Sequence, residues 1–281
     1  MFKIKLNNNK NFSCDKDTTI LNAAKSAGLV LEHSCLSARC RSCVVKVLKG
    51  NTENIQKEVV LSETEKREGF VLSCNAKPIS DLSLDIEDLG DVVLYDKKIV
   101  PSKIDLIEYV TKDVLKIIVR LPPTANFNFV SGQYVNIIKG SLNRSYSIAN
   151  MSGDNSKLTF YIKKYENGLM SDYLFNKAKG NDLLRLEGPL GSFFLRKSTK
   201  ENIIFLATGT GIAPIKAILE QIETSKEDYS DKKILLLVGA RKEKDFFWIP
   251  ETKSNIQVEY IPVLSRSNEN WIGKKGYVQN I

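Results

Sequence analysis

The chain has 281 residues, of which 42% are hydrophobic, and a formal net charge of +8 at pH 7. This length and apolar content are enough for packed cores and favour two or three domains. Lysines are spread along the whole chain without a basic block, which argues against nucleic-acid binding. No apolar h-region follows the first lysines, and no run approaches the roughly 18 apolar residues of a membrane span, so we predict a cytoplasmic protein with no membrane partner.

Residues 1–88 predict a small α+β domain. Alternating apolar and polar residues predict strands at 2–6, 11–14, 43–50 and 81–86. Helical spacing predicts helices at 18–29, ending at Gly28, and at 62–69. In the second helix, Ser62 and Glu65 have the spacing of a capping box. Residues 89–98 follow as a predicted linker.

Residues 99–198 are strand-like throughout. Turn residues at regular intervals separate six predicted strands, at 103–110, 113–122, 133–140, 144–150, 158–165 and 182–191. This spacing predicts an antiparallel β-barrel. From 199 to 281 the pattern changes to alternating strand and helix, with strands at 202–209, 232–241 and 258–266 and a helix at 212–223. That order predicts an α/β domain with a parallel sheet.

The cysteines carry the most specific signal. The pattern C-x4-C-x2-C is formed by Cys35, Cys40 and Cys43, and Cys74 lies much later in the sequence. This is the plant-type spacing for a [2Fe-2S] cluster, whereas zinc sites usually contain two pairs of closely spaced ligands. A zinc site or unliganded thiols are the alternatives; reduced cytoplasmic thiols disfavour a disulfide set.

Two neighbouring residues are not predicted to bind the metal. Cys14 lies on a predicted strand without partner spacing, and we interpret it as a buried free thiol. His33 is the single histidine of the chain. A Rieske centre needs two histidines, so His33 is interpreted as structural.

With this loop, the first domain resembles a plant-type ferredoxin, which has a β-grasp fold. The later motifs "RSYS", "YIKKYENGLMS", "EGPLGSFFL" and "ATGTGIAP" resemble the flavin and pyridine-nucleotide domains of the ferredoxin-NADP reductase family. The resemblance covers nearly the whole chain. It implies three cofactors: a [2Fe-2S] cluster, FAD and NAD(P)H.

For the flavin, the resemblance assigns roles to three residues of "RSYS". Arg144 would bridge the pyrophosphate, Tyr146 would place its ring against the isoalloxazine, and Ser147 would hydrogen-bond near the reactive flavin nitrogen, as a catalytic residue. Gly168 and Ser171 stand where the flavin-phosphate loop of the family enters a helix. A plain helix start capped by Ser171 is the alternative interpretation, and the two are compatible.

For the nucleotide, the resemblance points to the strand end at "ATGTGIAP". Gly209 and Gly211 would allow the pyrophosphate to approach the backbone, and Thr208 would lie near the hydride path, as a second catalytic residue. Ser265 and Arg266 match positions that hold the 2′-phosphate in NADPH-using relatives. A lone arginine at a strand end is also common as surface charge, so NADH and NADPH both stay open.

The sequence departs from the family pattern in two places. The family usually has glycine at the position of Ala38, and glycine or serine at that of Arg41, because glycine permits tight turns around the cluster. The side chains of Arg39 and Arg41 add positive charge beside the predicted cluster. This charge could tune the reduction potential of the cluster, bind an acidic partner protein, or simply be solvated at the surface. The family also continues beyond "WIGKKGYVQNI", so the last domain is expected to be incomplete at its C-terminus.

Together these features predict an NAD(P)H-dependent reductase that passes electrons from NAD(P)H to FAD, to the [2Fe-2S] cluster and then to a partner protein. The resemblance favours as partner a CDP-6-deoxy-4-ketoglucose-3-dehydrase of dideoxysugar synthesis. An oxygenase component is the alternative partner. A different class of function is an electron carrier that binds flavin and an iron-sulfur cluster without nicotinamide turnover, a hypothesis that the short C-terminus motivates.

Overall fold

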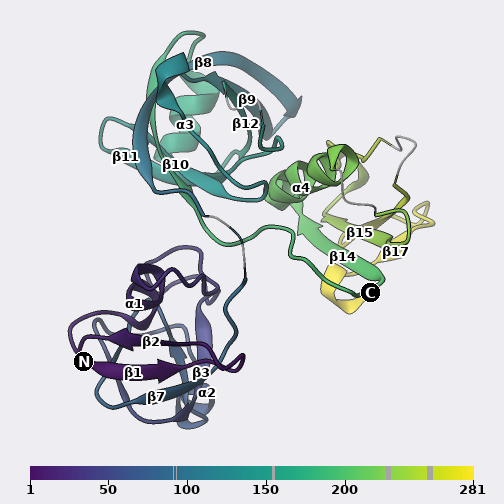
Figure 1. Cartoon of the computed structure of the whole chain (residues 1–281). Helices are drawn as coiled ribbons and strands as arrows, with labels where there is room; N and C mark the ends of the chain where they lie inside the picture. Colours follow the sequence, from purple (N-terminus) through teal and green to yellow (C-terminus); the bar gives the residue numbers. More distant parts are fainter. Residues whose placement is uncertain (91, 93, 154–155, 226–228, 252–255) are drawn as a thin grey trace. The chain divides into compact units, whose positions relative to one another are not determined.

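A computed structural model describes residues 1–90, 92, 94–153, 156–225, 229–251 and 256–281 (Figure 1). Its contacts divide the chain into two compact units. The first comprises Met1–Leu94 with Gly191–Phe193, and the second comprises Tyr95–Leu190 with Phe194–Ile281. The predicted linker at 89–98 includes residues 91 and 93, which lie outside the described residues.

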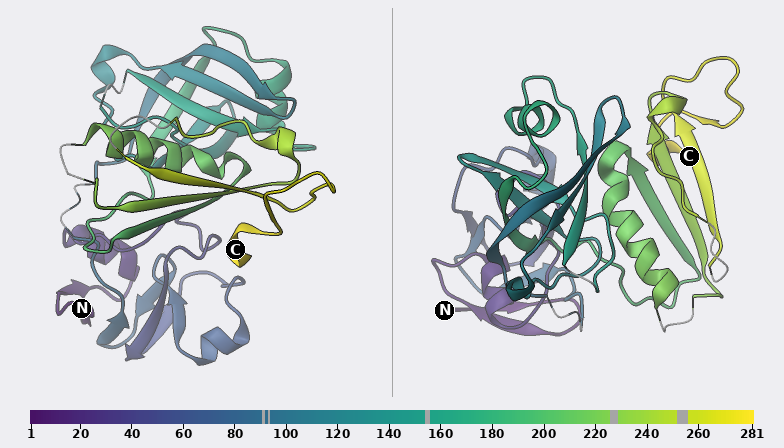
Figure 2. Two further views of the ribbon diagram at one scale, coloured as in Figure 1. Left: turned by 90° about the vertical axis from the view of Figure 1, so that its right-hand side faces the viewer. Right: turned by 90° about the horizontal axis from the view of Figure 1, so that it is seen from above.

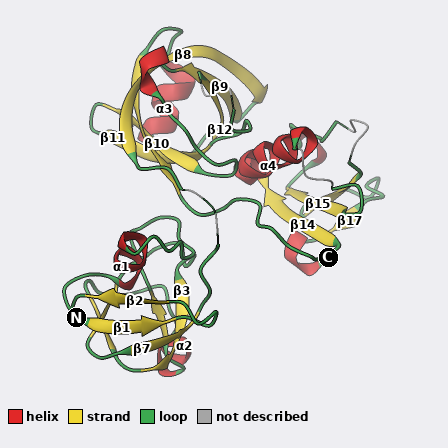
Figure 3. Ribbon diagram, viewed as in Figure 1, coloured by secondary structure: helices red, strands yellow, loops and turns green. Residues whose placement is uncertain are grey.

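The first unit is built on a five-stranded mixed sheet (Figure 3). Its strands, in spatial order, are β2 (Asn11–Cys14), β1 (Phe2–Lys5), β7 (Leu82–Asp85), β3 (Val44–Lys49) and β5 (Phe70–Leu72). Strand β1 runs parallel to β7 and antiparallel to β2. A two-stranded ribbon of β4 (Thr52–Asn54) and β6 (Ala76–Pro78) accompanies the sheet. This is the predicted β-grasp arrangement of an α+β domain.

Two short helices complete this unit. Helix α1 (Ile20–Ser26) begins at Thr19, whose side chain accepts from the Asn22 N–H, and its apolar residues Ile20, Leu21 and Ala24 enter the core. Helix α2 (Glu63–Arg67) begins with the predicted capping box of Ser62 and Glu65. Each cap satisfies N–H groups that have no partner within the helix, which fixes where the chain enters it.

The second unit contains a six-stranded antiparallel barrel sheet and helix α3 (Leu169–Asn176). The strands, in spatial order, are β11 (Leu142–Ser147), β10 (Tyr134–Lys139), β13 (Leu183–Leu190), β8 (Lys98–Thr111), β9 (Val114–Arg120) and β12 (Lys157–Lys163). All six predicted strands are therefore present. Alternating residues such as Ile104, Ile117 and Phe160 are fully buried inside, each stabilising the fold by about 1.5–3 kcal/mol.

The same unit contains a parallel sheet of β14 (Asn202–Thr208), β15 (Lys233–Ala240), β16 (Val258–Leu264) and β17 (Lys274–Lys275), in that order. Helix α4 (Ile212–Thr224) lies along one face of this sheet (Figure 2). Its buried side chains Ile215, Ile218 and Ile222 pack on Phe205 and Leu236. The α/β pattern predicted from 199 onward is confirmed.

Short 3-10 turns are described at η1 (Pro123–Ala125), η2 (Gly209–Gly211), η3 (Glu243–Asp245) and η4 (Val278–Asn280). Within the described ranges, every helix is too short or too polar to cross a membrane. The barrel and the parallel sheet are joined by an apolar cluster in which the Tyr161 and Phe247 ring centroids lie 4.9 Å apart, with Ala213 buried beside them.

Candidate functional site

The four predicted ligand cysteines lie together in the first unit, as two pairs. The N–H of Cys35 donates to Sγ of Cys40 at 3.3 Å, and the N–H of Cys40 donates to Sγ of Cys35 at 3.3 Å. Sγ of Cys43 lies 3.2 Å from Sγ of Cys74. Two pairs of thiols are the donor set that a cluster of two irons requires.

Main-chain hydrogen bonds bring the distant Cys74 to the cluster loop, defined here as residues 32–43. Cys43 directly precedes β3, and Cys74 lies in the turn between β5 and β6. The Ser73 N–H donates to the Cys43 carbonyl at 2.9 Å, while the Ser73 carbonyl accepts from Leu21 of α1 at 3.0 Å. The fold of the domain therefore closes the site.

Backbone N–H groups of the cluster loop point at the sulfurs. The N–H groups of Ser37 and Arg39 donate to Sγ of Cys35 at 3.4 Å. Burial alone would raise the pKa of Cys35, but these hydrogen bonds together lower it to about 6. The pKa of Cys74 falls to about 7, chiefly because the Cys43 thiol donates to it, with a further N–H from Ala38. These hydrogen bonds favour negative sulfur at Cys35 and Cys74, the form that ligates iron, whereas the hydrogen bond to Cys74 and burial raise the pKa of the Cys43 thiol.

The pairing of the thiols bears on the kind of metal site that they form. Cys35 and Cys40 make one pair, and Cys43 and Cys74 make another. A structural zinc site needs four ligands around one ion. The paired thiols with N–H donors around them fit a two-iron cluster better than zinc.

Cys14 and His33 lie where the sequence analysis expected them. The Cys14 side chain is 1% exposed and points at the carbonyls of Thr18 and Thr19. Burial raises the pKa of Cys14 to about 11. Nδ1 of His33 lies 2.8 Å from the Leu31 carbonyl, which ties the ring to its own loop.

The predicted flavin residues lie on β11, the edge strand of the barrel sheet. Arg144 and Tyr146 are two residues apart, so they share one face of the strand. Arg144 is exposed, and its guanidinium donates to the Asn143 carbonyl at 2.7 Å. Tyr146 packs against the barrel core, and burial raises its pKa to about 12. An arginine fork beside a half-buried ring suits a flavin with its pyrophosphate. Ser147 ends the strand and is half-buried.

Helix α3 contacts β11, the strand that contains these residues. The helix begins at Gly168, which has no side-chain cap. The predicted capping by Ser171 is wrong, because Ser171 lies inside the first turn. Its buried hydroxyl accepts from the Tyr165 N–H at 3.3 Å and lies 2.8 Å from the Gly168 carbonyl as a donor. Ser171 therefore fixes the loop, and the N–H groups of the first turn are the groups that can face a phosphate.

Gly168 itself is required by close packing. A Cβ added there would lie 2.6 Å from Oγ of Ser171 and 3.0 Å from Cβ of Tyr165. Both distances are shorter than ordinary van der Waals contact, so a side chain would push the loop and the helix start apart. The glycine predicted at this loop is explained by this packing.

Some of the predicted nucleotide residues, but not Gly211 or Arg266, line a cavity of about 380 Å³ at the carboxyl ends of β14, β15 and β16. Ligands bind in such sheets at this edge. Thr208, Gly209 and Ser265 line the cavity together with Lys163 and Tyr165 of the barrel. The second unit therefore combines strand ends of the parallel sheet with side chains of the flavin-type barrel in one cavity.

Gly209 and Gly211 leave room for a ligand. A Cβ added at either residue would meet no atom within 4 Å. Gly209 has a φ of +51°, which favours glycine, whereas Gly211 has an ordinary φ of −62°. The open space beside both residues is what a pyrophosphate close to the backbone would need.

Arg266 does not line the same cavity as Thr208 and Gly209. It lines a second cavity of about 580 Å³ with Lys242, Lys244 and Asn268. The Arg266 N–H donates to the Arg241 carbonyl at 3.1 Å, which holds the end of β16 beside that of β15. A cationic pocket next to the main cavity can accept an anionic group, but it does not by itself separate NADH from NADPH.

Tyr165 is a site residue that the sequence analysis did not single out. It lines the main cavity, is 69% exposed and lies close enough to Tyr146 to raise its pKa. Tyr165 lies between β12 and Gly168, within the motif "YIKKYENGLMS". Its membership of that motif is the sequence signal that could have identified it.

Comparisons with known proteins divide the chain in the same order as the motifs. Residues 4–78 match the 2Fe-2S iron-sulfur cluster binding domain, residues 101–195 the oxidoreductase FAD-binding domain, and residues 205–281 the oxidoreductase NAD-binding domain. These three families bind a [2Fe-2S] cluster, FAD and NAD(P)H, which confirms the predicted cofactors.

Similar proteins include reductases with two kinds of partner. The CDP-6-deoxy-L-threo-D-glycero-4-hexulose-3-dehydrase reductase of Yersinia pseudotuberculosis is 34% identical over 95% of this chain and 80% of its own length. Protein RfbI of Salmonella typhimurium is 37% identical over 97% and 80%. The xylene/toluene monooxygenase electron transfer component of Pseudomonas putida is 28% identical over 95% and 77%.

A solved structure supports the fold. The cytochrome P450 reductase GcoB of Amycolatopsis has a TM-score of 0.68 at 23% identity, over 99% of this chain and 84% of that one. At this identity the likeness concerns the fold alone, and it covers both units of the chain.

Proposed function

We propose that this chain, which belongs to the ferredoxin-NADP reductase family of iron-sulfur flavoproteins, supplies electrons to a CDP-6-deoxyhexulose-3-dehydrase, the enzyme for which its Yersinia relative is named. It is an NAD(P)H-dependent oxidoreductase in which electrons pass from NAD(P)H to FAD and on to the [2Fe-2S] cluster. The flavin links the two ends because it takes two electrons together and gives them up singly.

The observation that carries the proposed electron transfer is the paired arrangement of the four cysteines, whereas the choice of partner rests on the similar proteins. We propose Cys35, Cys40, Cys43 and Cys74 as the cluster ligands, with Cys35 and Cys40 on one iron and Cys43 and Cys74 on the other. The short Cys43–Cys74 separation and the N–H groups around Cys35 support this assignment. Reduced thiols of this kind persist in the cytoplasm, where we place the protein.

For the flavin we propose Arg144, Tyr146, Ser147 and the loop from Gly168 to Ser171. Arg144 supplies positive charge for the pyrophosphate, and Tyr146 supplies a fixed aromatic face, since its ring packs on the barrel core. For the nucleotide we propose Thr208, Gly209 and Gly211, with Arg266 at the neighbouring pocket. No side-chain acid or base is needed for these transfers, so the residues bind and orient.

An oxygenase component is the second candidate for the partner. The monooxygenase and phenol hydroxylase relatives, at 28–30% identity, support it. The dehydrase reductases of the two Yersinia species are more similar, at 34%, and for this reason the dehydrase is proposed first.

Chemical analysis and reconstitution test the proposal. We expect the purified chain to contain iron and acid-labile sulfide in equal amounts and to bind FAD. With NAD(P)H, it should restore turnover of a purified CDP-6-deoxyhexulose-3-dehydrase, and restore it better than that of an oxygenase component. If the chain restores turnover only with the oxygenase component, the oxygenase is the partner and the dehydrase is not. If neither NADH nor NADPH reduces the bound flavin, the electron-carrier hypothesis replaces the reductase.

Replacing Cys14 with alanine is expected to leave the cluster intact. The side chain is buried in the core, and its sulfur is hydrogen-bonded to the Thr18 and Thr19 carbonyls rather than to a proposed ligand. We expect a loss of about 1 kcal/mol in the free energy of unfolding, from the small cavity. Iron content and the visible spectrum, measured beside a denaturant titration, check this; loss of iron would contradict the assignment of Cys14 as a free thiol.

Replacing Gly211 with alanine is expected to weaken nucleotide binding without affecting folding. Its φ suits alanine and its Cβ meets no protein atom, so the methyl group would enter the space proposed for the pyrophosphate. We expect the KM for NAD(P)H to rise about tenfold or more, equivalent to roughly 1.4 kcal/mol, with an unchanged Tm. Steady-state kinetics and thermal unfolding measure the two quantities, and an unchanged KM would place the pyrophosphate elsewhere.

A further inference from the structure

The cluster loop is held in a shape that its residues disfavour. Leu36, Ala38 and Arg41 have φ values of 55°, 56° and 65°, in the left-handed region where side chains crowd the backbone. Something outside the loop must therefore keep it in place.

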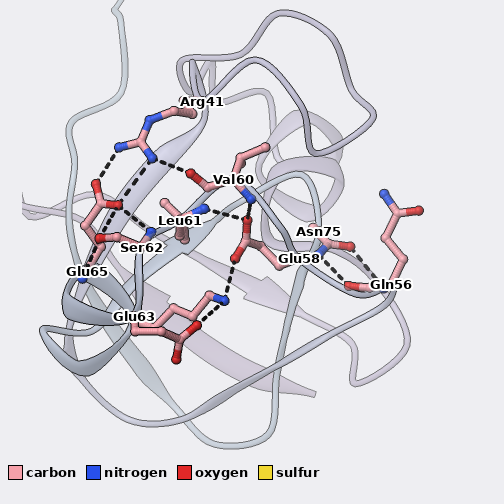
Figure 4. A network of polar contacts seen from close by, with 10 residues as sticks. Arg41, Gln56, Glu58, Val60, Leu61, Ser62, Glu63, Glu65 and Asn75 are labelled. Carbon is pink, nitrogen blue, oxygen red and sulfur yellow. Dashed lines mark hydrogen bonds and ion pairs between the residues drawn. The ribbon is translucent and has the colours of Figure 1, made fainter.

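Arg41 makes that contact through its side chain (Figure 4). Its guanidinium forms a two-pronged ion pair with Glu65, in which Nη1 lies 3.3 Å from Oε2 and Nη2 contacts Oε1. Nη1 also donates to the Val60 carbonyl at 2.6 Å. A planar guanidinium with three acceptors has a defined position, unlike a lysine or a solvated arginine.

Glu65 is itself fixed. Its Oε2 accepts from the N–H and from the hydroxyl of Ser62, each at 2.8 Å, as part of the capping box of α2. The Arg41 and Ser62 hydrogen bonds hold the pKa of Glu65 at about 2, so it stays charged at neutral pH. The helix cap thereby becomes an anchor for the cluster loop.

Residues 55–66, here called the brace, form a continuous support for this anchor. The side chain of Glu58 is 3% exposed; Oε1 accepts from the Val60 and Leu61 N–H groups, and Oε2 lies 3.4 Å from Nζ of Lys66. A buried carboxylate held in this way fixes the turn that presents the Val60 carbonyl to Arg41 (Figure 4).

The other end of the brace reaches both halves of the cluster site. Gln56 exchanges two hydrogen bonds with Asn75, the residue after Cys74, at 3.1 and 3.0 Å. Its side-chain amide donates to the Ser37 carbonyl of the cluster loop at 3.4 Å. The brace thus touches the loop at Ser37 and at Arg41, on either side of the N–H groups that point at Cys35.

We propose that Arg41 and Glu65 are positioning residues for the iron-sulfur cluster. By fixing the left-handed turn at Arg41, the pair keeps the N–H groups of Arg39 and Cys40 on Sγ of Cys35. Hydrogen bonds to cluster sulfur raise the reduction potential, because they favour the more negative reduced form. The pair therefore sets the potential and slows loss of the cluster. The inference rests on the cluster assignment of the proposed function.

Arg41→Ala and Glu65→Ala separate positioning from charge. A purely electrostatic role predicts opposite shifts of the cluster midpoint potential, downward without the arginine and upward without the glutamate. Positioning predicts a downward shift in both variants, because both release the same turn. Arg39→Ala is the matched control, because it removes an equal charge from an exposed side chain of the same loop.

The experiment uses the full chain with its cofactors. The midpoint potential is measured by redox titration, and the cluster half-life by loss of visible absorbance in a chelator. We expect Arg41→Ala and Glu65→Ala to shorten the half-life about fivefold or more, and Arg39→Ala to match the wild type. Arg41→Lys and Glu65→Gln should lose less than the alanine variants, because lysine still donates at position 41 and glutamine still accepts from Ser62 at position 65. These two variants also cover the case in which an alanine variant folds poorly.

An upward shift of the potential in Glu65→Ala with an unchanged half-life would overturn the positioning role. A wild-type chain that binds flavin but no iron would overturn the cluster assignment, and the inference with it. Wild-type values in all three alanine variants would overturn the inference alone and leave the proposed function standing.

Discussion

Replacing Cys74 with alanine is expected to abolish electron delivery to an outside acceptor while flavin reduction by NAD(P)H continues. Cys74 is the proposed ligand from outside the cluster loop, and main-chain hydrogen bonds around Ser73 hold it against Cys43. Without it one iron loses a thiolate, and a cluster with three ligands is expected to be lost. We expect the rate of acceptor reduction to fall at least about a hundredfold.

Flavin reduction should stay within about twofold of the wild-type rate, because the proposed flavin and nucleotide residues belong to the second compact unit. Cys14→Ala is the matched control, since it removes a thiol from the same unit without touching the pairs. The assignment of Cys74 fails if the variant keeps its iron, or if it reduces the acceptor at the wild-type rate.

Replacing Arg144 with alanine is expected to weaken FAD binding about a hundredfold, with little effect on folding. The side chain is exposed and hydrogen-bonds only to the neighbouring Asn143 carbonyl among the contacts described, so the barrel does not depend on it. A charged two-pronged contact to a pyrophosphate is among the strong hydrogen bonds, and a hundredfold corresponds to about 2.8 kcal/mol. Arg144→Lys should recover only part of the affinity, because lysine lacks the planar fork.

Fluorescence titration of the flavin-free chain with FAD measures the affinity. Arg185→Ala is the control, an exposed arginine on β13 of the same barrel. If the two variants lose equal affinity for FAD, Arg144 contributes only as one of several surface charges and not through a specific contact with the pyrophosphate. An unchanged affinity in Arg144→Ala would remove it from the flavin site.

Much of the fold is predictable because the periodic strands and helices are long. The six barrel strands and the strand-helix order from residue 199 follow from alternation and helical spacing. The strands at 52–54, 70–72 and 76–78 were not predicted, since three residues are too few to show a period. The turn that contains Cys74 lies between two of these short strands, β5 and β6, so the sequence pattern did not predict its position in the fold.

The site was predictable where spacing or a motif defines it, and less so where packing decides. The cysteine spacing named four thiols that the structure brings together as pairs. The predicted capping of the helix by Ser171 was wrong, because the helix starts at Gly168 and Ser171 therefore lies inside its first turn. The contact of Arg41 with Glu65 spans 24 positions of sequence, so no local pattern announces it. A glycine at position 41 has no side chain and could not make this contact with Glu65.

The most direct test of the account is anaerobic stopped-flow mixing of the full chain, with FAD and cluster in place, with NADH and separately with NADPH. We predict that one of the two nucleotides bleaches the flavin absorbance first, and that the cluster absorbance falls afterwards. In Cys74→Ala the first phase should persist and the second disappear. Flavin that neither nucleotide reduces at millimolar concentration, or a cluster that is reduced before the flavin, would contradict the proposed path.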